Sequence, residues 1–185
     1  MKFNKPPGWE ELLKDKNLCK QWVDSYMGRK VLKETTLKPD IFLKKAKHNL
    51  DFANWVYGKH EKEIKSLFKD NNFYDWVICA CYYSIYHSTL ALMAQEKMSS
   101  KSHTATLCAV IYFYYHNQRV LEKEHIQLIS ASIEREDVEI INRAKSLRER
   151  ASYNASETFE QTLADKSKNN AIKFLTKVQE ILENL

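Results

Sequence analysis

The apolar residues of this chain recur every three or four positions over several long stretches, the spacing that places them on one face of an α-helix. The first long stretch opens at Leu37-Lys38-Pro39-Asp40, where a proline and an acidic residue suit a helix start, and runs to Tyr57. A second follows the polar turn at residues 69–72 and runs from Trp76 to Ala94. This second stretch is apolar on most sides, which predicts the central helix of a bundle.

The rest of the chain continues the same helical pattern. Residues 1–37 predict a separate extension of two short aromatic-rich helices, and residues 38–185 predict the bundle itself. Within the bundle, further helices are expected over about residues 103–116, 122–133, 136–153 and 165–185. The pattern therefore predicts an all-α fold, an up-and-down helical bundle of four to six helices with a short helical N-terminal extension.

Composition supports this fold class. The chain has 185 residues, 44% of them apolar, with only three glycines and three prolines, so it lacks the turn residues that many short strands would need. No run of eighteen apolar residues occurs, and the N-terminus has no apolar signal-peptide core. We therefore expect a soluble, cytoplasmic protein that does not enter a membrane.

Charge is unevenly distributed along the sequence. The net charge is +5, and residues 1–50 hold twelve basic and six acidic side chains, a balance of +6 that leaves the remainder at −1. A basic N-terminal third can attract a phosphate backbone or an acidic protein surface. Because the lysines are scattered rather than clustered, a solvated lysine-rich surface is the alternative.

The sequence gives little support for metal or nucleophilic chemistry. Cys79 and Cys81 are two residues apart on a predicted helix, no Cys-x-x-Cys pair occurs, and reduced structural thiols are expected. A di-iron bundle needs two Glu-x-x-His motifs, whereas only Glu122 and His125 form one. No Gly-x-Ser-x-Gly elbow or phosphate-cradling glycine loop occurs either. We expect no metal and no cofactor.

Polar and aromatic residues at two places on the predicted bundle are candidates for binding. Tyr83 and His87 lie one turn apart on the central helix, where they either line a groove or form a buried, hydrogen-bonded pair. Lys101 and His103 stand at the start of the next helix, where Ser102 is expected to be the cap and Lys101 a phosphate contact.

A third group lies on the predicted penultimate helix. Arg150 and Asn154 are four residues apart and share one helix face, and Tyr153, three residues after Arg150, adjoins that face. Arg148 stands two residues before Arg150. Guanidinium groups can bind phosphate through two parallel hydrogen bonds. The alternative is that the arginines pair with neighbouring glutamates or a helix end.

The order of these motifs resembles the HEPN (higher eukaryote and prokaryote nucleotide-binding) domain family over about residues 38–185. The resemblance rests on five segments in order, which are residues 43–50, 82–92, 101–103, 147–153 and 171–174. It implies a helical bundle, frequent homodimerisation and a role linked to nucleotides or RNA. It also implies partnership with a minimal nucleotidyltransferase in toxin-antitoxin pairs, where the HEPN member is a metal-independent ribonuclease.

The chain departs from the family pattern at one position of the nuclease motif. Active HEPN nucleases carry an arginine followed four to six residues later by a histidine, but this chain has no histidine after His125. Asn154 stands six residues after Arg148 and four after Arg150. An asparagine can hydrogen-bond a ribose or phosphate but cannot exchange a proton near neutral pH.

Three functions stay open from the sequence. The leading hypothesis is a nucleotide- or RNA-binding component of a toxin-antitoxin or defence-type system without the standard nuclease activity. The second is an active ribonuclease in which the Arg148 region acts either with an out-of-motif histidine, such as His87 or His103, or with an asparagine that positions the ribose 2′-hydroxyl. The third is a dimerisation scaffold for a partner protein. The candidate binding residues are Arg148, Arg150, Tyr153, Asn154, Tyr83, His87, Lys101 and His103.

Overall fold

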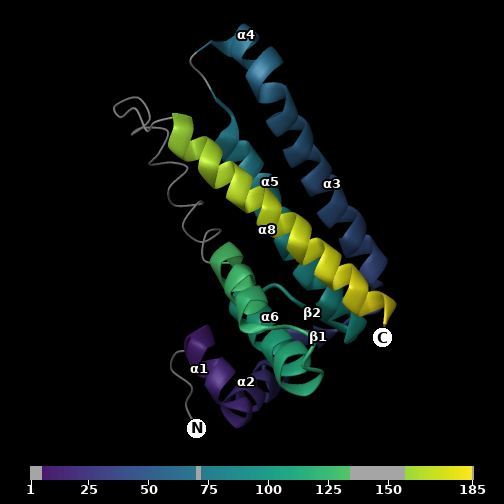
Figure 1. The fold of residues 1–185 in the computed structure, drawn as a ribbon. Helices are drawn as coiled ribbons and strands as arrows, with labels where there is room; N and C mark the ends of the chain where they lie inside the picture. Colours follow the sequence, from purple (N-terminus) through teal and green to yellow (C-terminus); the bar gives the residue numbers. More distant parts are fainter. Residues whose placement is uncertain (1–5, 70–71, 134–156, 185) are drawn as a thin grey trace.

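The computed structural model of this chain is a helical bundle, described over residues 6–69, 72–133 and 157–184. Three long helices, α3 (Pro39–Lys59), α5 (Tyr74–Gln95) and α8 (Glu157–Glu183), run along one another, and α5 packs against both of the others (Figure 1). The all-α fold class and the bundle predicted from the sequence are confirmed.

Helix α5 is the centre of this bundle. Ala91, Leu92 and Met93 are at most 1% exposed, and three successive residues point to different sides of a helix. The helix is long and apolar enough to cross a membrane, but 78% of its apolar window is buried inside the fold. This is the position of the core helix of a soluble domain, where neighbouring helices replace water around the apolar side chains.

The N-terminal helices α1 (Trp9–Lys14) and α2 (Lys16–Gly28) lie against α6 (His103–Val110) at one end of the molecule (Figure 1). Asp15 separates the two helices and caps α2, because its Oδ1 accepts hydrogen bonds from the backbone N–H groups of Asn17 at 2.8 Å and Leu18 at 3.0 Å. Trp22 of α2 is buried in the same hydrophobic core as the bundle helices. The sequence-based boundary at residue 37 stays a prediction.

Two short strands, which the sequence pattern did not predict, tie the extension to the bundle. β1 (Leu32–Glu34) pairs antiparallel with β2 (Met98–Ser100), with Leu32 opposite Ser100. The backbone N–H of Thr35 extends the ribbon by donating to the Lys97 carbonyl at 2.9 Å. Each strand has only three residues, too few for an alternating pattern to be visible.

The observed helix bounds can be compared with those predicted from the apolar pattern. The helix predicted over residues 103–116 is observed as α6 followed without a break by the π-helical segment η2 (Ile111–Asn117). Helix α3 likewise continues into η1 (His60–Ile64) and α4 (Lys65–Phe68), and a further helix covers residues 123–133. The helix predicted over residues 136–153 lies outside the described residues.

The π-helical turn η1 has a visible packing role. It buries the imidazole of His60 completely and stacks it on the ring of Tyr74, with ring centroids 3.9 Å apart.

Helix α8 begins at Glu157, eight residues before the predicted start at Asp165. The apolar pattern did not mark this first part of α8, where the fully buried residue Ala164 is too small to stand out.

Candidate functional site

The structure places three of the predicted site residues in one chain of ring contacts, in which Tyr83 lies near His87, and His87 and His103 both lie near Tyr86. Tyr83 and His87 are half-buried on α5, with ring centroids 6.3 Å apart, and His103 is half-buried at the first turn of α6. The ring of Tyr86 lies between the two histidines, 5.9 Å from His87 and 4.9 Å from His103. Lys101 is exposed in the loop between β2 and α6, two residues before His103.

The hydrogen bonds of His87 define its neutral tautomer. Its Nδ1 lies 2.8 Å from the backbone carbonyl of Tyr83, and a carbonyl can only accept. Nδ1 therefore carries the proton, and Nε2 is the nitrogen that can accept a hydrogen bond. Asn49 lies beside the same Nδ1 at 3.3 Å, but its amide nitrogen donates to the Lys45 carbonyl at 2.9 Å.

His103 is positioned by a cap that the sequence predicted. Ser102 is the N-cap of α6, and its hydroxyl accepts a hydrogen bond from the backbone N–H of Ala105 at 3.3 Å. Ser100 holds the preceding turn, because its hydroxyl accepts from the N–H of Ser102 at 2.9 Å. The cap orients the first turn of α6, and so places His103 against Tyr86.

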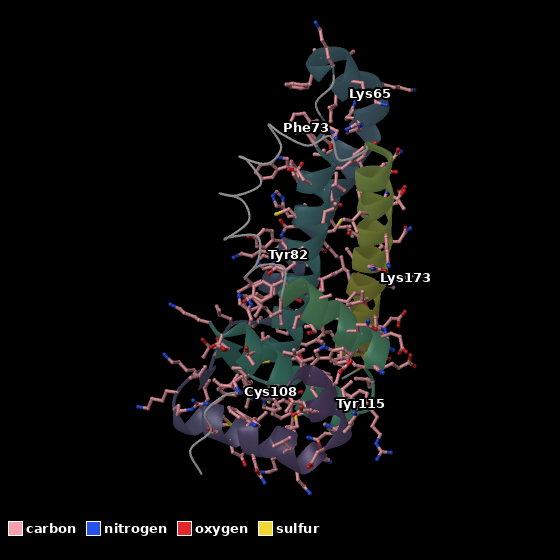
Figure 2. All side chains as sticks on the ribbon, turned by 90° about the vertical axis from the view of Figure 1, so that its left-hand side faces the viewer. Lys65, Phe73, Tyr82, Cys108, Tyr115 and Lys173 are labelled. Atoms are coloured by element: carbon pink, nitrogen blue, oxygen red, sulfur yellow. The ribbon has the colours of Figure 1, made fainter. Side chains whose placement is uncertain are left out.

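A cavity of about 540 Å³ opens beside this cluster, between α5, the helix of residues 123–133 and α8. Tyr82, labelled in Figure 2, connects the cluster to the cavity, because it lines the cavity and its ring centroid lies 5.0 Å from that of Tyr83. Cavities of this size suit small ligands. The polar lining residues are Glu124, His125, Gln127, Ser132, Lys166, Ser167, Asn170 and Lys173.

Two lysines give one wall of the cavity a positive charge. Lys166 and Lys173 are exposed on α8, and Asn170 lies between them on the same helix face. Neither lysine forms an ion pair with a carboxylate of the described residues. Sequence reasoning missed these residues, although their spacing of four and three is a signal that they share one face.

His125 sits in the cavity wall as a neutral base. Burial lowers the pKa of His125, and the nearby Lys177 lowers it further, while Glu122 and Glu124 oppose the shift. Its Nδ1 accepts a hydrogen bond from the backbone N–H of Glu122 at 3.1 Å, which places the proton on Nε2. The ring packs near Phe174, with centroids 6.4 Å apart.

The thiol in the cavity is not a nucleophile. Burial raises the pKa of Cys81 to about 12, which Lys168 only partly offsets, so the thiol is protonated at neutral pH. Within the described ranges, no three His, Cys, Asp or Glu side chains converge on a point that could hold a metal ion. The chemistry that the described cavity offers is hydrogen bonding, stacking and charge.

The penultimate-helix residues of the candidate site, Arg148, Arg150, Tyr153 and Asn154, lie outside the described residues. Their roles, and the reach of His87 or His103 to Arg148, stay predictions.

Comparison with known proteins identifies one related family. A family model described as HEPN domain matches residues 59–184, which include α5, α6, the cavity and every candidate site residue named from the sequence. No curated protein and no solved structure matches the chain. The match points to a function related to nucleotides or RNA.

Proposed function

This chain belongs to the HEPN domain family, whose model covers residues 59–184, and we propose that it binds nucleotide or RNA as a component of a toxin-antitoxin or defence-type system. We propose that it acts in the cytoplasm, without the standard nuclease activity of the family. The family resemblance further supports pairing with a second copy and with a minimal nucleotidyltransferase.

The observation that carries this proposal is the cavity of about 540 Å³ beside the tyrosine and histidine cluster. Its rim carries the ammonium groups of Lys166 and Lys173, which suit phosphate oxygens, and Asn170 offers both a donor and an acceptor. The ring of Tyr82 provides an aromatic wall on which a base can stack. Together these groups match the three parts of a nucleotide.

Binding is favoured over cleavage because the proton-transfer residue of the family motif is missing. Cleavage of RNA by a metal-independent route needs groups that take a proton from the ribose hydroxyl and give one to the leaving oxygen. Asn154 stands at the motif position and cannot do either. Arg148 and Arg150 retain the capacity to bind phosphate.

A ribonuclease is the second candidate function, and one observation favours it. His87 and His103 flank the ring of Tyr86, so two imidazoles lie at one place on the bundle. Histidine is the side chain whose ordinary pKa suits proton transfer near neutral pH. A nuclease of this type would use histidines from α5 and α6 in place of the motif histidine.

The test measures RNA binding and cleavage with the full chain. Fluorescence anisotropy with a short labelled single-stranded RNA, in the presence of a chelator, is expected to show binding without cleavage. The double variant Lys166→Gln, Lys173→Gln should weaken binding by at least about tenfold, because each lysine contributes one phosphate contact. The matched control is Lys44→Gln, Lys47→Gln, which removes two exposed lysines of α3 outside the cavity.

The alternatives predict different results in the same assay. RNA cleavage in chelator, abolished by Arg148→Ala, would establish the nuclease instead. An absence of affinity for both RNA and nucleotides would leave the dimerisation scaffold, and light scattering of the purified protein would then show whether it is a dimer.

A further inference from the structure

A second, open groove of about 660 Å³ lies where α1 and α2 meet the end of η2 and the segment that follows it. Lys14 and Lys16 line it from the N-terminal extension, and Arg119 and Lys123 line it from the bundle. Figure 2 shows Tyr115, which also lines the groove, at this junction. The groove shares no lining residue with the cavity described above.

The lining of this groove carries an excess of positive charge. The four cations face one lining carboxylate, Glu122, so the lining carries a net charge of +3 with His116 neutral. All four are exposed, and none forms an ion pair within the part of the chain that the structure describes. Elsewhere on the surface lysines do pair, as Lys20 does with Asp24 at 2.6 Å.

The acidic residue nearest in sequence does not neutralise the groove lysines. Asp15 stands between Lys14 and Lys16, but its Oδ1 accepts hydrogen bonds from the backbone N–H groups of Asn17 and Leu18. The carboxylate is therefore directed to the start of α2, where it complements the helix dipole. The two lysines are left to face the groove.

One side-chain hydrogen bond joins the two walls of the groove, and backbone bonds shape the wall on the bundle side. His116 donates from Nε2 to the carbonyl of Leu12 at 2.8 Å, which fixes the end of α1 against η2. The N–H groups of Val120 and Leu121 both donate to the carbonyl of Tyr114, at 2.9 and 3.1 Å. These bonds close a tight turn around Arg119, which adopts the left-handed backbone conformation with φ of 59°.

From this geometry we propose that the groove binds the phosphate groups of a single-stranded RNA. Three lysine ammonium groups and one arginine guanidinium group suit phosphate oxygens, which carry the negative charge of RNA. The ring of Tyr115 adds a face on which a base can stack. An open, polar groove suits a strand that passes through it.

The site gives the N-terminal extension a role in binding. Lys14 and Lys16 lie outside the matched family region of residues 59–184, whereas Arg119 and Lys123 lie inside it. The groove is therefore complete only when the extension is docked on the bundle. This inference concerns a different set of residues from the proposed function and does not rest on it.

The size of the expected effect follows from counterion release. Each phosphate contact with a single strand contributes about 0.7 to the slope of the logarithm of the binding constant against the logarithm of salt concentration. Removing two contacts should therefore lower that slope by about 1.4, and at about 0.1 M salt should weaken binding about 25-fold. The loss should be the same for RNAs of different sequence, because phosphate contacts do not read bases.

The experiment compares two double variants of the full chain with equal charge change. Lys14→Gln, Lys123→Gln removes one lysine from each wall, and Lys44→Gln, Lys47→Gln removes two exposed lysines of α3 outside the groove. Anisotropy titrations with labelled single-stranded RNA at several salt concentrations should show the 25-fold loss and the shallower slope in the first variant only. Circular dichroism melts check that both variants are folded.

Competition with inorganic triphosphate distinguishes the two sources of phosphate. If triphosphate displaces RNA only at millimolar concentration, the groove recognises the strand, as proposed. Displacement at micromolar concentration would identify a free polyphosphate or nucleotide as the ligand and overturn the RNA proposal. Equal losses of RNA affinity in both double variants would also overturn it. No loss of RNA affinity in either variant would overturn it as well, and an acidic protein surface would then be the partner to test.

The proposal for the cavity and the proposal for the groove are tested by different variants, so one can be overturned without the other. A loss confined to Lys14→Gln, Lys123→Gln would support the groove and leave the cavity without a role in RNA binding. A loss confined to Lys166→Gln, Lys173→Gln would support the cavity and overturn the groove.

Discussion

Replacing Trp22 with alanine tests whether the N-terminal extension is part of the cooperative core. Trp22 is 4% exposed, its ring lies 5.6 Å from that of Tyr26, and it belongs to the core shared with the bundle helices. A buried aromatic side chain removes about 200 Å² from water, and at about 25 cal/mol per Å² this gives an upper limit of about 5 kcal/mol. We expect Trp22→Ala to lower the free energy of unfolding by about 3–5 kcal/mol.

The assay is urea unfolding and thermal melting followed by far-ultraviolet circular dichroism. For a chain of this length, about 1 kcal/mol shifts the Tm by about 2–4 °C, so the expected decrease is about 6–20 °C. Trp55→Ala is the matched control, because Trp55 is 60% exposed on α3 and its removal should change stability by less than about 0.5 kcal/mol. Equal effects of the two substitutions, or a separate early transition in the unsubstituted chain, would refute the reasoning.

Three further predictions follow from buried polar groups. Tyr114→Phe should cost about 1 kcal/mol in urea unfolding, because the fully buried hydroxyl donates to the Leu92 carbonyl at 2.8 Å; an unchanged midpoint would contradict this. Cys81, whose pKa burial raises to about 12, should resist iodoacetamide at pH 7 in the folded chain, and rapid alkylation detected by mass spectrometry would show that it is accessible. Burial lowers the pKa of His125, so the folded state favours the neutral imidazole. Its contribution to stability is complete above pH 6.5 and is lost as the pH falls through the pKa of the folded state. The Tm should therefore fall from pH 7 to pH 5, and less steeply in His125→Gln.

The apolar pattern predicted the long helices well because each buries one continuous face. Residues such as Leu50 on α3 and Phe174 on α8 recur with helical spacing and are buried as expected. The ribbon of β1 and β2 was not predictable, since three residues per strand carry no periodicity and the pairing joins residues far apart in sequence. The π-helical turns η1 and η2 were also not predicted, because a π-helical turn adds one residue to a helical turn without requiring particular residue types.

The candidate site was predictable in part. Tyr83, His87 and His103 were chosen from sequence spacing, but the approach of His103 to Tyr86 required the packing of α6 against α5. Lys166 on α8 was missed because an exposed lysine on a helix looks the same whether its face borders a cavity or bulk water. Spacing gives the face on which a side chain lies, but only tertiary structure gives what that face meets.

The contact between α2 and α6 has a consequence for biosynthesis. Cys19 and Cys108, whose sulfurs lie 4.0 Å apart, are separated by 89 residues, so α2 leaves the ribosome long before its partner helix exists. At about 5–20 residues per second, the interval is on the order of 4–18 seconds. During that time α2, whose buried face includes Trp22 and Val23, lacks the helix against which it packs, so part of its apolar face stays in contact with water.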